Sequence, residues 1–308
     1  MINRINELKK MTYGPDMIGI APASRFDKDD PIFKILPETK SVICLVYRIP
    51  RGVQRGIEEG TTYYHYSTIG IECLEETIMP MMTLRCARIL EEEGYIGLPQ
   101  RKTQTIMQEE DSTNPEILYN HIRRGITQEY QMNYTESAAK CGVGEIGLSG
   151  SLLTDDFGPL QRYCFVLTDA ELEPTPEFKA HICDGCGDCL KACPGKAIKD
   201  GKKDPWQCAA YYAGANMSKN PFMSNHALSH REDRLEILSG EKQLTAEDAK
   251  DVINNISYYP PIMHSYISSI CGHACDRACY VHLEEKGVLN KKFHNKFRTR
   301  EEWVLEVK

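Results

Sequence analysis

The sequence lacks any long apolar run and any excess of basic side chains. No stretch of the 308 residues approaches the roughly 18 apolar residues of a membrane-spanning helix. The polar segment 1–10 has no apolar core of a secretion signal. Basic side chains number 37 against 44 acidic ones, a net charge of −7, whereas nucleic-acid binders normally carry a basic face. We therefore expect a cytoplasmic protein with neither a membrane nor a nucleic-acid partner.

Cysteine, by contrast, is abundant and follows a specific spacing. Eight of the thirteen cysteines form C-x2-C-x2-C-x3-C-P, an isolated cysteine, and C-x3-C-x3-C: Cys183, Cys186, Cys189, Cys193, Cys208, Cys271, Cys275 and Cys279. The first run is the signature of bacterial [4Fe–4S] ferredoxins, whose fourth cysteine binds the neighbouring cluster. Because disulfides are rare in the cytoplasm, clustered cysteines there more often bind metal.

The spacing predicts two clusters with exchanged ligands. Three closely spaced sulfurs serve one cubane, and its fourth ligand comes from elsewhere in the chain. One cluster would take Cys183, Cys186, Cys189 and Cys279, and the other Cys193, Cys208, Cys271 and Cys275. Structural zinc, the alternative, usually takes two ligand pairs, which three successive short spacings do not offer. The last run is less regular, and His273 within it is an alternative ligand.

The chain divides into two parts and a tail. Residues 1–172 have the pattern of a mixed α/β domain, and Pro174 with Pro176 marks its boundary. Residues 173–285 hold all eight motif cysteines and an insertion at about 220–262. Residues 286–308 form a charged tail, with Val304 and Leu305 as expected anchors.

Apolar periodicity predicts several elements. Short apolar runs bounded by turn residues indicate buried strands at 17–20, 42–47 and 163–168. Apolar residues recur at helical spacing from Ile71 to Leu90, and Pro80 should kink or restart that helix. In the insertion, Thr245-x-x-Asp248 fits a capping box.

A glycine-rich stretch is a candidate cofactor contact. Residues 142–147 match G-x-G-x-x-G, but a dinucleotide fingerprint follows a strand and opens a helix. Here the stretch follows a helical pattern and leads into an extended one, which argues against dinucleotide binding. Its glycines still allow backbone to approach a bulky ligand, so we predict cofactor contacts at Gly142, Gly144, Gly147 and Gly158.

An aromatic patch at 62–66 offers a second cofactor contact. Tyr64 and His65 could stack on a ligand while offering a proton, or the tyrosines could lie at a subunit boundary. Arg123, Arg124 and Arg162 are candidates for anion binding.

Taken in order, these motifs resemble the epoxyqueuosine reductase and corrinoid reductive dehalogenase superfamily. The likeness covers about residues 12–285 without the insertion, and it is carried by Tyr64-His65, 138–147, 152–154, 157–159, Arg162, 166–169, the cysteine run and 206–212. The resemblance implies an α+β fold: a nitroreductase-like three-layer α/β core with a C-terminal bacterial-ferredoxin-like two-cluster module. It also implies cobalamin in the cleft between them, near Tyr64 and His65, and an external ferredoxin or flavodoxin as electron donor.

Two departures from the superfamily shape the expected chemistry. The epoxyqueuosine enzymes have an aspartate general acid where this sequence has Gln128, and glutamine is no useful proton donor. Glu145 matches the dehalogenase form of the loop, but respiratory dehalogenases carry an export signal that this sequence lacks. We therefore expect a tyrosine acid, Tyr130 or Tyr64, with Arg124 or Arg162 positioning an anionic group, because arginine can stabilise the phenolate.

Three functions stay open at this point. The first is a corrinoid-dependent reductase of a small molecule. The second is an electron carrier that reductively activates a corrinoid partner protein. The third is a flavin-binding reductase, since nitroreductase-like cores can hold FMN.

Overall fold

The computed structural model describes residues 1–100, 130–256 and 269–305. Within these ranges, none of the helices combines the length and the apolarity that crossing a bilayer requires.

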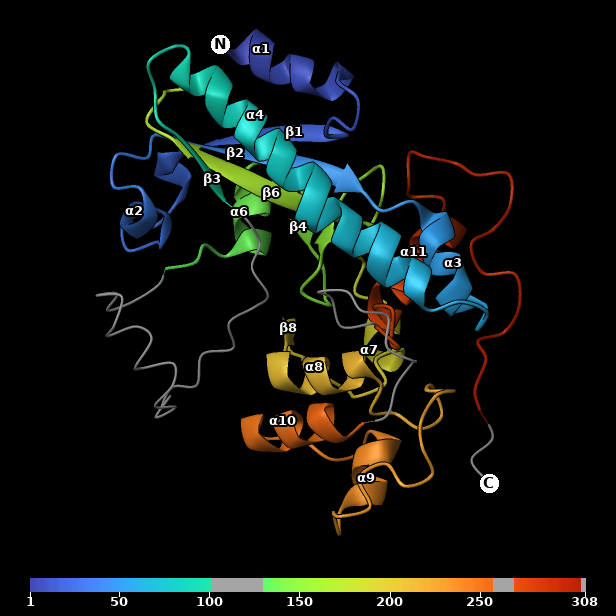
Figure 1. Cartoon of the computed structure of the whole chain (residues 1–308). Helices are drawn as coiled ribbons and strands as arrows, with labels where there is room; N and C mark the ends of the chain where they lie inside the picture. The colour runs from blue at the N-terminus through green and yellow to red at the C-terminus, as the bar shows by residue number, and fades with distance from the viewer. Residues whose placement is uncertain (101–129, 257–268, 306–308) are drawn as a thin grey trace.

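A four-stranded antiparallel sheet organises the N-terminal part (Figure 1). Its order is β1-β2-β6-β3, and the strands are β1 Met17–Pro22, β2 Ser41–Arg48, β6 Gln161–Thr168 and β3 Gly97–Gln100. The two long strands, β2 and β6, pair from Ser41 opposite Thr168 to Arg48 opposite Gln161. The strands predicted from apolar runs are therefore present.

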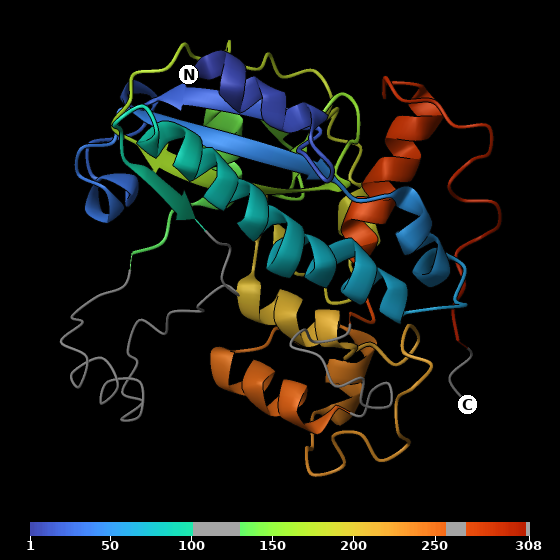
Figure 2. The same ribbon diagram turned by 45° about the horizontal axis from the view of Figure 1, so that its top comes forward.

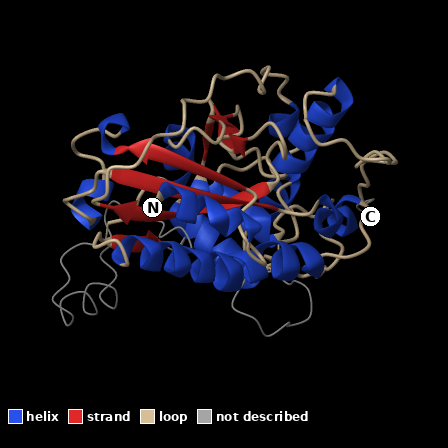
Figure 3. Cartoon of the chain, turned by 90° about the horizontal axis from the view of Figure 1, so that it is seen from above, coloured by secondary structure: helices blue, strands red, loops and turns tan. Residues whose placement is uncertain are grey.

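Helices cover both faces of this sheet. Side chains of β2 alternate, so Ile43 and Leu45 join one apolar cluster while Val42 and Cys44 join another. The first cluster packs under α1 Ile2–Glu7, η1 Leu8–Lys10 and α4 Met79–Glu91, and the second under α2 Ile32–Ile35 and α6 Tyr134–Lys140. The strands lie side by side in Figure 3, with helices packed along them. The prediction of a mixed α/β chain is confirmed.

A long helical segment enters α4. It begins as the π-helical stretch η3 Tyr66–Ile78 and continues as α4. Pro80 lies in the first turn of α4, directly after the end of the π-helical stretch. The chain stays helical through this proline, so the predicted kink or restart is seen only as a change from π-helical to α-helical pattern. The segment before it contains α3 Arg51–Glu58, which follows β2 directly.

The cysteine-rich part packs directly on the first. Its elements are α7 Asp188–Lys191, the hairpin β7 Ile198–Lys199 with β8 Lys202–Lys203, α8 Pro205–Ala213 and α11 Ala274–Lys286. Helix α11 packs on α7, and Tyr280 and Leu283 of α11 belong to the same apolar cluster as Met82 of α4. Two short strands, β4 Glu145–Ile146 and β5 Leu152–Leu153, form a hairpin of their own.

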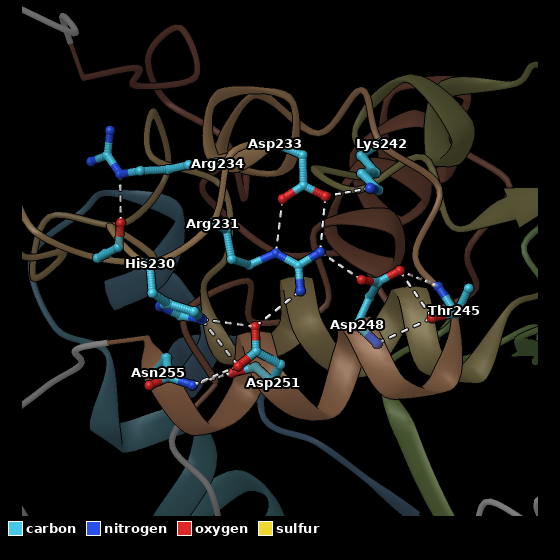
Figure 4. A network of polar contacts seen from close by, with 10 residues as sticks. His230, Arg231, Asp233, Arg234, Lys242, Thr245, Asp248, Asp251 and Asn255 are labelled. Atoms are coloured by element: carbon cyan, nitrogen blue, oxygen red, sulfur yellow. Dashed lines mark hydrogen bonds and ion pairs between the residues drawn. The ribbon is translucent and has the colours of Figure 1, made fainter.

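The insertion has a small core. Helices α9 Arg234–Ser239 and α10 Ala246–Asn255 bury Ile237 and Val252 against Tyr211 of α8. The capping box predicted at Thr245 and Asp248 is present. Arg231 joins the elements through ion pairs to three aspartates (Figure 4): Asp233, Asp248 and Asp251.

The tail runs past α3 toward the insertion (Figure 2). Phe297 is fully buried, and Trp303 donates its indole N–H to the carbonyl of Ile57. Val304 is 62% exposed, so its predicted role as an anchor is wrong, because the larger aromatic side chains take the apolar contacts.

Candidate functional site

Four of the motif cysteines line one cavity beside the glycine-rich stretch. Cys183 and Cys186 come from the loop that leads into α7, Cys189 lies in the first turn of α7, and Cys279 comes from α11. Cys183 and Cys186 are exposed, whereas Cys189 is buried. All thirteen thiols of the chain are free of disulfides.

The other four line a second cavity, and none of these four cysteines is exposed. Cys193, Cys208, Cys271 and Cys275 meet there, together with Lys203, Tyr212 and His273. The two groups of four are those that the exchanged ligand pattern predicts, although iron ligation itself stays a prediction.

The separations between the cysteine sulfurs bear on the kind of group that these residues could bind. Four sulfurs around one zinc at about 2.3 Å would lie about 3.8 Å from one another. Among the described residues, two groups of three possible metal-binding atoms lie within 4.8 Å of one another, and each group contains only one cysteine. No three cysteine sulfurs are therefore that close together. Each group of four sulfurs lines one cavity, as an inorganic group that spans the distance between the sulfurs requires.

Backbone amides point at several of the sulfurs. The N–H of Leu148 donates to Cys183 Sγ at 3.3 Å, that of Ala197 to Cys193 Sγ at 3.2 Å, and that of Ala274 to Cys271 Sγ at 3.4 Å. Such bonds to sulfur tune the potential of iron–sulfur clusters. Burial raises the pKa of Cys208 to about 12, against the opposing charge of Lys203. Metal binding would therefore release a proton from this thiol.

A buried acidic and imidazole pair lies beside the second cavity. Asp276 accepts hydrogen bonds from Ser151 Oγ at 2.7 Å and from His273 Nδ1 at 2.8 Å. Burial alone would raise the pKa of Asp276, but the bond from His273 and the charge of Lys203 bring it below the ordinary range. Burial lowers the pKa of His273 to about 4, so the ring is neutral at pH 7. The backbone of His273 is left-handed, with φ of 51°.

A second buried group connects this cavity to the sheet. Arg162 on β6 donates from Nη2 to Tyr66 Oη at 2.9 Å, and its Nε lies 3.1 Å from Glu75 Oε1. The Tyr66 ring lies 6.0 Å from that of His273, which in turn lies 5.4 Å from that of Tyr212. Burial raises the pKa of Tyr66 well above its ordinary value, and the charge of Arg162 opposes this. Adjacent side chains therefore extend from the second cavity to Arg162.

The residues predicted to be catalytic do not all meet. Arg162 pairs with Tyr66 and not with Tyr64. The rings of Tyr64 and His65 contact each other, with centroids 4.7 Å apart and planes tilted by 45°, and both side chains are exposed. Tyr130 is 41% exposed, and Arg124 lies outside the described residues.

The four predicted glycines face the chain itself. A Cβ at Gly142 would lie 2.2 Å from the carbonyl oxygen of Pro176, and one at Gly144 would lie 2.1 Å from that of Leu153. The nearest atoms at Gly147 belong to Leu153, and those at Gly158 to Leu283 and Leu289. Close chain packing thus explains glycine at these positions, and their contact with a cofactor stays a prediction.

Sequence reasoning missed four residues at this site. Tyr66 lay within the aromatic patch but was passed over for Tyr64, and Glu145 was noted only for its resemblance. Asp276 could have been found as the single acidic residue between Cys271 and Cys279, whereas Glu75 is flanked by Glu72 and Glu76 and has no such signal.

Comparison with known proteins gives short sequence matches. No family profile matches the chain. A segment of 71 residues is 42% identical to the tetrachloroethene reductive dehalogenase of Desulfitobacterium hafniense, covering 22% of this chain and 13% of that protein. A segment of 76 residues is 33% identical to the epoxyqueuosine reductase of Listeria monocytogenes, covering 24% of this chain and 20% of that protein. The predicted resemblance to this superfamily is confirmed.

Solved structures of the superfamily align over more of the chain. Epoxyqueuosine reductase from Streptococcus thermophilus aligns with a TM-score of 0.46 and 13% identity, over 93% of this chain and 82% of that one. A reductive dehalogenase studied for B12-dependent dehalogenation aligns with a TM-score of 0.44 and 15% identity, over 78% and 32%. Likeness at this level carries no inference about activity. The relatives are reductases, but the sequence matches span only 13–20% of the proteins compared, so their activities reach this chain only as proposals.

Proposed function

We propose that the chain is an iron–sulfur oxidoreductase with two [4Fe–4S] clusters that deliver single electrons to a reduction site near Arg162 and Tyr66. The observation that carries the proposal is the grouping of eight cysteines into two cavities of four, with sulfurs too far apart for one ion. In fold terms, we regard the sheet with its two helix layers as a nitroreductase-like core and the cysteine-rich part as a ferredoxin-like module.

The exposure of the cysteines supports one direction of electron transfer. Cys183 and Cys186 of the first cavity reach solvent, where a small donor such as ferredoxin or flavodoxin could dock. The second cavity is lined by His273 and Tyr212, which lead toward Arg162. When bound, the clusters supply one-electron transfer, and the protein residues determine where the electrons enter and leave.

Tyr66 takes the place of Tyr64 or Tyr130 as our proposed proton donor. Its hydroxyl accepts a hydrogen bond from the Arg162 guanidinium, which would stabilise the phenolate that remains after proton transfer. Because burial raises the pKa of Tyr66 well above its ordinary value, this phenol would protonate only a strongly basic centre. A carbon centre that has just gained two electrons meets that condition.

Iron and sulfide analysis tests the clusters. Anaerobically purified protein should contain about eight irons and eight acid-labile sulfides per chain. Cys271→Ser should reduce both to about four, because it removes one ligand of the second cluster only. Cys73→Ser is the matched control, since Cys73 lies outside both cavities and should leave the content unchanged. Zinc in place of iron would refute the proposal.

Cobalamin rests on the resemblance alone. The described residues fit it poorly, because Tyr64 and His65 contact each other at the surface and the four glycines face the chain's own atoms. We therefore assign no step to it. Extraction of the bound cofactor, and absorption spectra before and after addition of hydroxocobalamin, would show whether cobalamin, FMN or neither binds. A base-off cobalamin spectrum would support the corrinoid-dependent form of the proposal.

One observation favours the electron carrier as a second candidate. Tyr66 is fully buried, so its hydroxyl does not reach solvent in the described structure. A carrier that activates a corrinoid partner protein would need no substrate at this position. Rapid cluster reduction, no small-molecule turnover and a stable complex with the partner would identify this function.

A further inference from the structure

The glycine-rich stretch holds a carboxylate against the start of the cysteine motif. Glu145 on β4 accepts the backbone N–H groups of three consecutive residues: His181 at 2.6 Å, Ile182 at 3.1 Å and Cys183 at 2.6 Å. Glu145 is only 9% exposed. A nearly buried carboxylate with three backbone donors is a strong local restraint, because bonds to charged groups are the stronger class of hydrogen bond. It fixes the chain where the first ligand of the motif begins.

The same stretch also contacts the sulfur of Cys183. Leu148 donates its backbone N–H to Cys183 Sγ at 3.3 Å. A Cβ at Gly147 would lie 3.7 Å from that sulfur, and Gly147, Leu148 and Ser149 all line the first cavity. The glycine stretch therefore contacts Cys183 at both its backbone and its sulfur.

The order of elements excludes the nucleotide reading of this motif. A dinucleotide fingerprint places its glycines between a strand and a helix N-terminus, where the pyrophosphate binds. Here the glycines follow α6 and lead into the β4–β5 hairpin. The tight approach of Gly144 to the carbonyl of Leu153 shows that glycine lets this hairpin close.

We propose that the G-x-G-x-x-G stretch of this chain is the cradle of the first cluster, with Glu145 as the positioning residue that fixes Cys183. This inference rests on the proposed function, because it requires a cluster in the first cavity. A fixed negative charge so close to the ligand loop also disfavours reduction of that cluster, since its potential depends on nearby charge.

The test compares two substitutions of Glu145 with reference variants. Cys183→Ser and Cys271→Ser define the iron content and the electron paramagnetic resonance spectrum of protein that lacks the first or the second cluster. Glu145→Ala should lower iron from about eight to about four per chain and give the spectrum of Cys183→Ser. Glu145→Gln keeps the shape and one acceptor oxygen but removes the charge. It should retain both clusters and increase the equilibrium constant for reduction of one of them about tenfold. This corresponds to a rise of about 59 mV in a one-electron potential.

A matched control separates this effect from general carboxylate loss. Asp169 accepts the backbone N–H of Ile96 at 2.8 Å, at the end of the sheet and outside both cavities. Asp169→Asn should therefore leave iron content and both potentials unchanged.

Several outcomes would overturn the inference. Full iron content in Glu145→Ala, or loss of the second cluster or of both clusters alike, would show that Glu145 does not serve the first cavity. If Glu145→Ala fails to fold, the potentials of Glu145→Gln decide, and unchanged potentials refute the proposal. Wild-type protein without iron is a different result, because it refutes the proposed function itself and this inference falls with it.

Discussion

Arg231 holds the insertion together, and its replacement by methionine tests how much stability one guanidinium supplies. Its Nε and Nη2 donate to the two oxygens of Asp233, both at 2.8 Å, while Nη1 donates to Asp251 at 3.0 Å and Nη2 also to Asp248 (Figure 4). Asp248 and Asp251 belong to α10, whereas Asp233 lies at the start of α9. Arg231→Met keeps an apolar stem but leaves three neighbouring carboxylates without their shared partner.

The exposure of the side chains determines how much stability Arg231→Met is expected to remove. The side chains of Arg231 and its partners are 17–30% exposed. Fully exposed ion pairs contribute about 0–1 kcal/mol each, and removal of one partner from a buried pair costs about 3–5 kcal/mol. This network lies between the two cases, so we expect the opening free energy of the insertion to fall by about 2–3 kcal/mol.

The pH dependence of this loss has a definite sign. Hydrogen bonds from Arg231 and Lys242 hold the pKa of Asp233 below its usual value of 3.8. For Asp248 and Asp251, burial alone would raise the pKa, but the bonds from Arg231 bring it below 3.8. A carboxyl with a depressed folded pKa stabilises the fold above its unfolded pKa and loses this contribution as pH falls through the folded value. The effect of Arg231→Met should therefore be larger at pH 7 than at pH 3.

Hydrogen exchange of the α10 peptide, followed by mass spectrometry, measures this loss locally. A fall of about 2–3 kcal/mol speeds exchange at pH 7 by about 30- to 150-fold, relative to intrinsic rates. Arg234→Met is the control, because Arg234 donates to the carbonyls of Ala227 and Asn225 and its effect should not vary with pH. Unchanged exchange in Arg231→Met, or an increase of equal size at pH 3, would show that the ion pairs do not stabilise the insertion.

Three further predictions follow from the structure. Arg277→Met should lower the free energy of unfolding by about 3–5 kcal/mol, because Arg277 and Glu58 are an ion pair only 6% and 3% exposed; a thermal melt unchanged from wild type would contradict this. Gly144→Ala should lower the free energy of unfolding by more than about 2 kcal/mol, because its Cβ would meet the backbone. Gly52→Ala, in open space within α3, should instead raise the free energy of unfolding by up to about 1 kcal/mol. A urea titration of both variants measures these two changes. An iron chelator should remove the more exposed first cluster before the second, in a time course of absorbance and resonance spectra; simultaneous loss would contradict the assigned exposures.

Local chemistry explains what the sequence could predict. Cysteine spacing fixes which thiols share a loop, and the structure brings the same groups of four together. Apolar runs predict β2 and β6, and the capping box at Thr245 and Asp248 predicts the start of α10. Both predictions succeed because helix caps and strands depend on residues that are neighbours in the sequence.

The pairing of Arg162 with Tyr66 could not be predicted in the same way. These residues lie 96 positions apart, and their contact depends on which face of η3 meets β6. A π-helical stretch changes that face relative to a regular helix, so periodicity at 3.6 residues does not identify it. The role of Glu145 was equally hidden, because its partners are backbone N–H groups, which carry no sequence signal.

The two cysteine loops are held by charges of opposite sign. Glu145 places a negative charge at the first loop. At the second, Arg277 donates to the carbonyls of Cys271 and Gly272 and shares its one carboxylate partner with another arginine of the tail, which leaves that triad one positive charge in excess. Each reduction adds a negative charge to a cluster, so nearby positive charge favours it and nearby negative charge opposes it. The residues that position the ligands would therefore also bias an electron from the first cavity toward the second, where Tyr212 and His273 lead on to Arg162.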